Sequence, residues 1–439
     1  MINLNWQTIT SRNAVLLAIT GVCLFTMFNL KSGNERWKSI LSNDARGYYA
    51  YLPALIIYGD PTFAASSAIE LTKLEFTHYR LAYGNGAVNK YLVGTAIAQL
   101  PFFLMAHTFA ISTGNVSDGY TRLYGLSVAI AAIFYLIFGC FQLYHFLSNF
   151  TKAEKHLPLV IAFIVFGTNL FYYTVVESGM SHVYSFAFVA LFVRYAYKAL
   201  NSYDLSALYI AAIALAIIVL IRPVNILVLL FIPAFFKNPI QTFLAVFKNY
   251  KTQLFLPVLV MLLLMGVQPL MYFLSSGEWF VDSYPGEGFD FTNPHMWDFL
   301  FSFKKGLFVY APVLAFASMG IFVIWKSSKP QAVYLVGGFL FLVYMLSSWT
   351  NWWYGGSFGS RVLVEYLVIF AFLLQLILDR IQTMKLKRSI IATICALALF
   401  TQFQSWQYRK GIIHWEKMNA ERYWDVLFDV ERLDQKDWK

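Results

Sequence analysis

Long apolar stretches alternate with short polar turns along most of this chain. A helix that crosses a membrane needs about 20 consecutive, mostly apolar residues, and runs of that length are too long for strands. The stretches that approach this length lie at 13–31, 120–147, 158–176, 181–200, 205–221, 223–237, 254–274, 307–325, 331–349, 361–379 and 389–408. We therefore predict an all-α polytopic membrane protein with about 11–12 transmembrane helices and interfacial helices in its first outer loop.

The first stretch and the shortest stretch each have a distinctive context. Arg12 precedes 13–31 and Lys31 ends it, with no small-residue cleavage site between them. We expect this stretch to be a retained anchor rather than a removed signal peptide. The stretch 223–237 is short, so we expect it to be tilted or partly covered by its neighbours.

One further run, 91–112, contains Pro101 and His107 and is compatible with either a full crossing or a juxtamembrane helix. If it does not cross, basic residues concentrate on one side, where the positive-inside rule places the cytoplasm. The short loops of the other side then carry only Arg122, Arg222 and Arg361. The rule favours eleven spans with the amino end inside and the carboxyl end outside. The basic residues on the inside would be Arg12, Lys152, Lys155, Lys198, Lys237, Lys248, Lys251, Lys326, Lys329, Arg380, Lys385, Lys387 and Arg388.

Composition agrees with membrane embedding. The chain of 439 residues is 59% hydrophobic and only 13% charged, against about 25% charged residues in soluble proteins. A soluble enzyme, a disordered protein and a secreted disulfide scaffold are excluded, and the cysteines Cys23, Cys140 and Cys395 are predicted to be small core residues. The net charge of +10 concerns orientation and anionic lipids rather than nucleic acid, because no basic domain stands apart.

We predict a single membrane domain over 1–439. Its longer hydrophilic segments, about 32–90, 275–306 and the tail 409–439, would share the outer face. The tail is amphipathic enough to lie on that surface or to cover a site there.

An acid near the start of the first outer segment is the leading candidate for chemistry. Asp44 precedes an apolar, aromatic run, Tyr48–Tyr58, that suits an interfacial helix. At this depth the carboxylate could act as a general base on an acceptor hydroxyl or amine. The alternative is a helix N-cap.

A second polar cluster occupies a short outer turn between two spans. Glu177 and His182 lie five positions apart in it, and such groups are costly at a bundle mouth without partners. Glu177 could be a second acid or an orienting group, and His182 could bind a phosphate. Alternatively, the two side chains pair with each other or cap the next helix. A divalent metal on these groups and Asp44 is the less favoured reading, because their spacing is not diagnostic. No cofactor is firmly predicted.

Cations recur at the same predicted membrane level. Arg222 stands alone in an apolar hairpin, Lys304 and Lys305 precede a span, and Arg361 follows an aromatic turn. They could converge on one phosphate, or they could snorkel to the interface. In the loop 278–298, acids alternate with aromatic residues, a pattern compatible with a sugar-binding surface.

Several motifs together resemble the C-type superfamily of polytopic glycosyltransferases, which includes the protein mannosyltransferases and the lipid A aminoarabinose transferase. More specifically, they are similar to bacterial transferases of the dolichyl-phosphate-mannose type. The motifs are Asp44-Ala45-Arg46-Gly47-Tyr48-Tyr49, Lys90-Tyr91-Leu92-Val93-Gly94 with Pro101-Phe102-Phe103, Glu177–His182, Gly306-Leu307-Phe308 and Trp352–Arg361.

This resemblance implies transfer of a sugar from a polyprenyl-phosphate carrier to a lipid, glycan or protein acceptor, usually with inversion. The reaction would occur at the outer face of a bacterial cytoplasmic (inner) membrane. The resemblance implies that Asp44 is the catalytic base, Glu177 the second acid and Arg222 a phosphate ligand, helped by His182, Lys304, Lys305 and Arg361. Ala45 stands where several relatives carry a second acid, which disfavours a metal-bound site. The acceptor and sugar would contact Tyr48, Lys90, Tyr91, Glu287, Trp352, Trp353 and Tyr354.

Two other functions also require many spans. A transporter or flippase usually carries ionisable residues deep in its helices and often has internal repeats. Here the intramembrane charges are few, with Arg194 and Glu365 close to span ends, and no repeat is evident. A non-catalytic scaffold subunit would use the tail as a docking element. For the transferase, the expected partners are the lipid-linked donor, the acceptor and membrane lipids, without nucleic acid.

Overall fold

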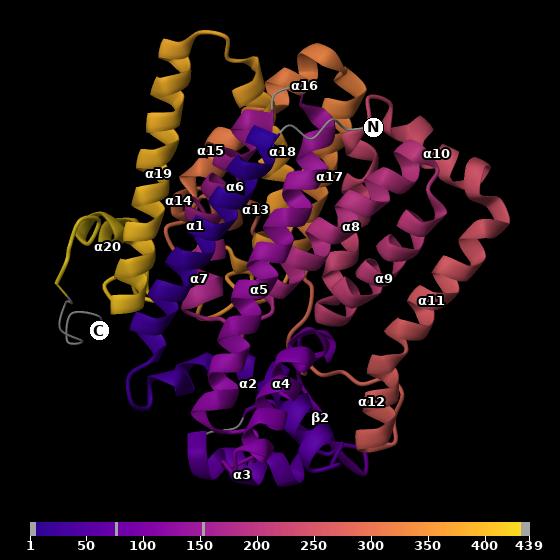
Figure 1. The fold of residues 1–439 in the computed structure, drawn as a ribbon, viewed down its shortest axis with the longest axis vertical. Coiled ribbons are helices and arrows are strands. Elements are labelled where there is room, and N and C mark those ends of the chain that lie inside the picture. Colours follow the sequence, from indigo (N-terminus) through magenta and orange to yellow (C-terminus); the bar gives the residue numbers. More distant parts are fainter. Residues whose placement is uncertain (1–5, 75–77, 152–153, 432–439) are drawn as a thin grey trace.

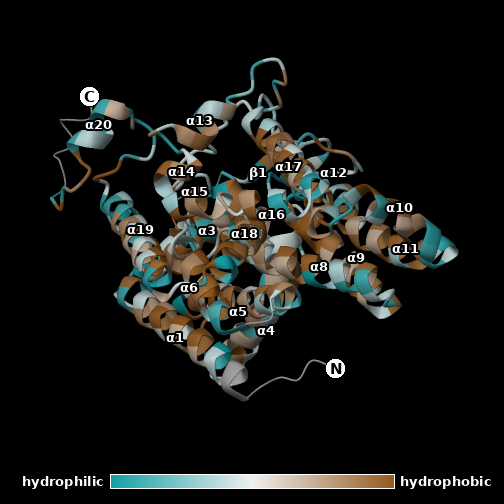
Figure 2. Ribbon diagram, turned by 90° about the horizontal axis from the view of Figure 1, so that it is seen from above, coloured by the Kyte–Doolittle hydropathy of each residue, from teal (hydrophilic) through white to brown (hydrophobic). Residues whose placement is uncertain are grey.

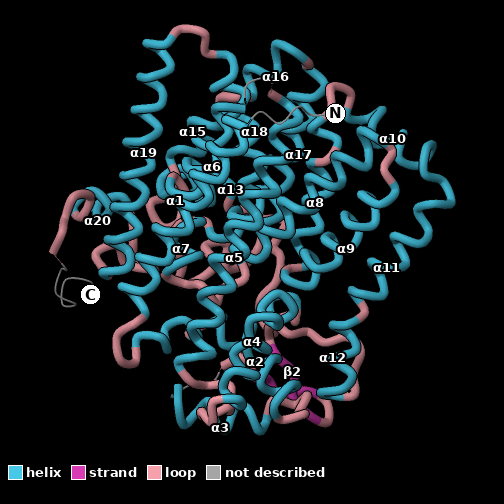
Figure 3. The backbone as a smooth tube through the Cα atoms, viewed as in Figure 1, coloured by secondary structure: helices cyan, strands magenta, loops and turns pink. Residues whose placement is uncertain are grey.

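The computed structural model describes residues 6–74, 78–151 and 154–431. Almost all of the described elements are helices (Figures 1 and 3). The described strands, β1 (Arg80–Tyr83) and β2 (Gly86–Asn89), form one antiparallel hairpin. Within these described residues, eight helices are long and apolar enough to cross a membrane. The predicted class, an all-α polytopic membrane protein, is therefore confirmed.

The first hydrophilic segment folds into a layer at one end of the bundle, which we call the α2 face (Figure 1). Its helix α2 begins at Asp44 and gives way to the π turn η2 at Pro53, so the predicted helix Tyr48–Tyr58 starts earlier and is divided. Proline lacks the N–H that would continue the α-helical bonding. The layer comprises η1 (Arg36–Leu41), α2 (Asp44–Leu52), η2 (Pro53–Ile57), α3 (Ala64–Leu74), the β1–β2 hairpin and α4 (Gly94–Ser112).

Helix α4 begins and ends at the α2 face, although its length and composition would suit a crossing. Before it, the Tyr91 hydroxyl donates to Asp44 of α2. After it, the Tyr49 hydroxyl donates to the Gly119 carbonyl at 2.5 Å, and Lys73 of α3 pairs with Asp118. Both ends of the run 91–112 therefore lie at the α2 face, as expected for a helix that does not cross.

Eleven helical segments within the described residues connect the two faces. Contacts at the opposite face join the ends that lie away from α2: Arg12 with His145 at 3.0 Å, and the Ser328 hydroxyl with the Lys237 carbonyl at 2.6 Å. The segments are α1 (Trp6–Lys31), α5 (Arg122–Leu147), α6–α7 (Leu157–Phe166, Leu170–Val175), α8 (His182–Ser202), α9 (Leu205–Ile221), η5–η6 (Pro223–Phe231, Pro233–Phe235), α11–α12 (Phe255–Met265, Val267–Ser276), α14–α16 (Leu307–Tyr310, Pro312–Ser318, Ile321–Ser327), α17 (Lys329–Ser347), η8–α18 (Arg361–Tyr366, Leu367–Arg380) and α19 (Met384–Lys410).

Shorter elements complete the described chain. Helix α10 lies at the opposite face, and α13 and α20 follow the outer loops near the α2 face. The Tyr250 hydroxyl at the end of α10 donates to the Ala199 carbonyl at 2.6 Å, which fixes this helix to the end of α8. These elements are η3 (Ser148–Phe150), η4 (Glu154–His156), α10 (Pro239–Tyr250), η7 (Lys251–Leu254), α13 (Met296–Phe301) and α20 (Ala420–Asp425).

Five predicted spans are not continuous α-helices, namely 158–176, 223–237, 254–274, 307–325 and 361–379. The stretch 158–176 breaks at Gly167, where a Cβ would lie 2.5 Å from the Phe163 carbonyl oxygen and 2.7 Å from Val313. The short stretch 223–237 is largely 3-10 helix. A 3-10 helix rises about 2.0 Å per residue, against 1.5 Å for an α-helix, so this short segment reaches further across the bundle.

The core lies around α5, α8 and α18, whereas α1, α11 and α19 are peripheral and expose apolar side chains. Figure 2, looking along the bundle, shows hydrophobic residues predominating along the crossing helices. Cys23 and Cys140 are buried as predicted, but Cys395 is exposed on the peripheral helix α19. The prediction for Cys395 was wrong because an apolar run does not distinguish a core face from a lipid-facing one.

Candidate active site

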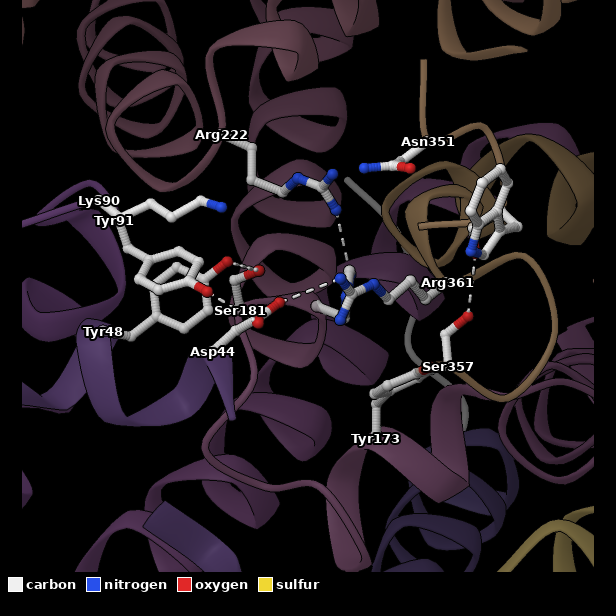
Figure 4. A network of polar contacts seen from close by, with 12 residues as sticks. Asp44, Tyr48, Lys90, Tyr91, Tyr173, Ser181, Arg222, Asn351, Ser357 and Arg361 are labelled. Atoms are coloured by element: carbon white, nitrogen blue, oxygen red, sulfur yellow. Dashed lines mark hydrogen bonds and ion pairs between the residues drawn. The ribbon is translucent and has the colours of Figure 1, made fainter. Parts of the chain in front are cut away.

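Asp44 is the first residue of α2 and faces the centre of the α2 face. Its Oδ2 accepts from the Arg361 guanidinium at 3.0 Å, and its Oδ1 accepts from the Tyr91 hydroxyl at 2.8 Å (Figure 4). The N-cap position is Asn43, and it makes no side-chain capping bond. Asp44 therefore contacts side chains from distant parts of the chain instead of capping its own helix.

These partners keep Asp44 ionised. Burial alone would raise the pKa of the Asp44 carboxyl, but the Arg361 charge and the Tyr91 hydrogen bond outweigh it, so the pKa is lowered below its ordinary value of 3.8. The Arg361 Nε is buried and has no hydrogen-bond partner among the described residues. Arg361 therefore retains a donor beyond its contact with Asp44.

Two cavities meet at the Asp44–Arg361 ion pair. Cavity A, of about 920 Å³, extends toward the carboxyl-terminal tail. Cavity B, of about 590 Å³, extends between the ends of α9, η5 and α12. Asp44, Arg361 and Gly355 line both cavities. A molecule in either cavity can thus approach the same carboxylate.

Cavity B collects three cations from separate segments. Lys90, Arg222 and Arg361 all line it, and in Figure 4 the charged ends of these side chains approach one central space. Lys90 pairs with Glu287 at 3.0 Å, and the Asn351 amide donates to the same carboxylate at 3.2 Å. Three cations around one cavity provide the charge and donors that a phosphate requires.

Arg222 is held by Glu365, a residue that was not among the predicted site residues. Glu365 is fully buried, and its Oε1 lies 3.4 Å from Arg222 and 3.0 Å from the His182 Nδ1. Its Oε2 is buried without a hydrogen-bond partner in the described structure. One carboxylate thus orients both Arg222 and His182 at the wall of cavity B.

Glu177 lines cavity A but not cavity B. Its Oε1 accepts from the Tyr172 hydroxyl at 2.9 Å, and burial raises the pKa of the carboxyl against the opposing influence of Arg361. Glu177 and His182 therefore have separate partners and line separate cavities, which rules out the predicted alternative of a mutual pair. Among the residues that the structure describes, no cluster of three metal-ligating side chains occurs.

Several predicted sugar-binding residues converge on cavity B, namely Tyr48, Lys90, Tyr91, Glu287 and Tyr354. Trp352 and Trp353 lie outside both cavities. Trp352 stacks on His295, and Lys304 lies 3.8 Å above the Trp353 ring. Trp349, three positions earlier than Trp352, lines cavity B instead.

The lysine pair also lies outside both cavities. Lys305 is buried and donates to the Ser357 carbonyl of the turn that precedes Arg361. Burial and the nearby Arg361 charge lower the pKa of Lys305 to about 7. Arg222 and Arg361 therefore line one cavity, and their binding of a phosphate stays a prediction, whereas Lys304 and Lys305 contact the neighbouring turn.

Some residues that line the two cavities are not among the predicted site residues, and only a few of these carry a signal in the sequence. Glu365 places a charge inside an apolar stretch, although the sequence does not identify its partner. Tyr284 lies in the loop 278–298 and the tail was predicted to be able to cover a site, but only the folded chain shows which of their residues line the cavities; His78 carried no local signal.

The chain matches no model of a known protein family, and no curated protein matches its sequence. Among solved structures, it is similar to the archaeal oligosaccharyltransferase AglB from Archaeoglobus fulgidus in complex with an inhibitory peptide and a dolichol-phosphate. The identity is 10% and the TM-score 0.49, covering 96% of this chain and 58% of that one. It is also similar to the apo oligosaccharyltransferase of the same organism, at 13% identity and a TM-score of 0.46, covering 96% of this chain and 60% of that one. The chain thus spans less than two thirds of the length of these proteins.

Proposed function

We propose that the protein is a membrane glycosyltransferase that moves a sugar from a polyprenyl-phosphate carrier to an acceptor on the outer face of a bacterial cytoplasmic membrane. The observation that carries this proposal is the position of Asp44 where cavities A and B meet. A transfer reaction needs a donor site and an acceptor site that share the reacting groups. The sequence motifs described above support the same class.

Cavity B is the proposed donor site. Arg222 and Lys90 line it, and Ile221, Pro223 and Val224 add apolar lining at the ends of two crossing segments. A lipid-linked phosphate combines an anionic head with an apolar tail. The head would contact the cationic side chains, and the tail would contact the apolar residues. Arg361 contributes the buried Nε donor described above.

The proposed chemistry is a single displacement at the anomeric carbon. The acceptor oxygen in cavity A forms the new glycosidic bond as the bond from the anomeric carbon to the phosphate oxygen breaks. Asp44 takes the acceptor proton, and the released polyprenyl phosphate keeps the bonding electrons, with its charge stabilised by Arg222, Lys90 and Arg361. A hydroxyl becomes strongly acidic as its oxygen forms the new bond, so a carboxylate with a low pKa suffices as the acceptor of the proton.

Membranes containing the Asp44→Asn variant would be assayed for transfer of labelled sugar from polyprenyl-phosphate donors to endogenous acceptors. The amide cannot take the proton, so we expect a loss of about 10²–10⁴-fold. Asp282→Asn is the matched control, because Asp282 is an exposed acid of an outer loop that lines neither cavity. Full activity in Asp44→Asn would remove the base assignment, and ion-coupled uptake by the wild type would point to a transporter.

A further inference from the structure

The carboxyl-terminal segment 411–417 forms one wall of cavity A, opposite the first outer segment. Buried glutamines of α19 hold this part of the chain. The Gln407 backbone carbonyl accepts from Ile412 N at 3.0 Å, and its side-chain amide donates to the Val426 and Asp429 carbonyls. The Gln404 amide donates to the Tyr423 hydroxyl at 2.5 Å. The wall is therefore an ordered surface.

Trp415 lies on this wall with 46% of its surface exposed, although it lines the same cavity as Asp44. The His414 Nδ1 accepts from the backbone N–H groups of Glu416 and Lys417, which fixes the turn that carries the indole. A Cβ added to Gly356 would lie 3.8 Å from the Trp415 Cε3, in van der Waals contact, and the His414 ring stacks beside the indole with the ring centroids 5.8 Å apart. An indole that is fixed by its neighbours and half exposed at a cavity is suited to stacking on a ligand.

The rest of cavity A is mixed in character. Ser39, Ser42, Asn43 and Glu177 contribute hydroxyl, amide and carboxylate groups beside apolar residues such as Met180. Sugars present apolar C–H faces beside hydroxyls that donate and accept hydrogen bonds, and this combination matches an indole surrounded by such groups.

We propose that Trp415 is the stacking platform for a saccharide acceptor, so that cavity A binds a carbohydrate rather than a peptide. This inference rests on the proposed function, because it assigns the acceptor class of the same reaction. Trp415 would position the sugar so that one hydroxyl meets Asp44, and the tail would determine acceptor specificity.

The test is saccharide binding to the full-length protein in detergent, which requires no turnover. Saturation-transfer difference NMR would measure the affinity for neutral hexose disaccharides and for chitobiose. Trp415→Ala is expected to weaken binding about tenfold or more, as truncation of a tryptophan anchor commonly does. Gly356→Val, which fills the space before the indole without altering it, should weaken binding similarly. Trp415→Phe should restore part of the affinity.

Trp424→Ala is the matched control, since Trp424 is 62% exposed on the same tail and lines neither cavity. Unchanged melting temperatures would show that the variants fold. Equal binding by wild type and Trp415→Ala would overturn the proposal, as would binding of a serine- or threonine-containing peptide but of no saccharide. If saccharides bind through Trp415 while no sugar is transferred from polyprenyl phosphate, the proposed function fails and the saccharide site stands.

Discussion

Asp44 and Arg361 depend on each other at the centre of the site. The guanidinium keeps the carboxylate charged in a place where burial would otherwise neutralise it. Both side chains retain some exposure, 24% for Asp44 and 15% for Arg361, through the cavities that they line. The pair therefore stabilises the fold at the junction of the two cavities, and the proposed function adds a chemical role.

The pH dependence of sugar transfer should reflect the lowered pKa of Asp44 beside Arg361. Because the folded pKa of Asp44 is lowered, activity that needs its carboxylate should persist to below about pH 4 and fall only as the pH drops through that lowered value. The contribution of Asp44 to stability depends on pH in the same direction: it is present above the unfolded pKa and is lost on acidification.

In Arg361→Ala, the acid limb of the pH profile of kcat/KM should move to higher pH, and the free energy of unfolding should fall by about 1–3 kcal/mol. Arg361→Lys, which keeps the charge, should shift the limb less.

Glu365 supplies a second test at this scale. In Glu365→Gln, the amide has a similar shape but no charge, so Arg222 and His182 lose the anion that orients them. We expect the KM for the lipid donor to rise about tenfold, which corresponds to about 1.4 kcal/mol, with little change in the KM for the acceptor. Asp379→Asn is the control, because it makes the same chemical change at the far end of α18. Equal effects on both KM values would argue against a role confined to the donor site.

Individual charges at outer turns were predictable, whereas their partners were not. Asp44, Arg222 and Arg361 stand out because each interrupts apolar sequence at the same predicted level. The sequence predicts Trp352 and Trp353 as site residues, whereas Trp349 lines cavity B, because sequence does not show which ring of an aromatic turn faces inward. Glu365 follows Arg361 by only four residues, yet it pairs with Arg222.

At the scale of elements, apolar length predicted the crossing segments well. It could not reveal that α4 stays at one face, since this depends on contacts made by residues on either side of it. The break at Gly167 also involves packing with a distant helix, since a Cβ there would lie 2.7 Å from Val313. In 223–235, by contrast, Pro223 and Pro233 begin the two 3-10 segments, so the interruption has a local cause.

The crossing of α4 and α9 depends on one glycine. A Cβ at Gly94 would lie 2.3 Å from Ile221 N and 2.4 Å from the Leu220 carbonyl carbon, where backbone must give way. Gly94→Ala should therefore destabilise the protein by about 1–3 kcal/mol and displace Ile221 from the wall of cavity B. Gly21→Ala is the control, because a Cβ there meets nothing within 4 Å and the change favours the helix. Thermal unfolding in detergent would compare them; equal melting temperatures would contradict the packing argument.

At the scale of the whole molecule, successive crossing helices end at opposite faces of the bundle, and this order determines which turns share a face. The orientation of that face toward the outside remains a prediction of the positive-inside rule. Convergence of Asp44 with Arg222 and Arg361 on one side was predictable from this alternation. The two cavities were not, because each is assembled from segments hundreds of residues apart.

Cysteine labelling of sealed, right-side-out vesicles would test the topology. With Cys395 replaced by serine, the exposed positions Arg80→Cys and Asn115→Cys, on either side of α4, should both react with an impermeant maleimide. Lys248→Cys on α10 should react only after the membrane is permeabilised. Opposite accessibility of positions 80 and 115 would mean that α4 crosses the membrane.

The walls of cavity A come from segments far apart in the sequence. Translation makes residues 39–45 well before residues 411–417. A nascent chain would therefore carry Asp44, the proposed base, before cavity A has both of its walls. Insertion of α19, which precedes residues 411–417, completes this cavity. Under the proposed function, a nascent chain would then have no acceptor site until α19 is in place.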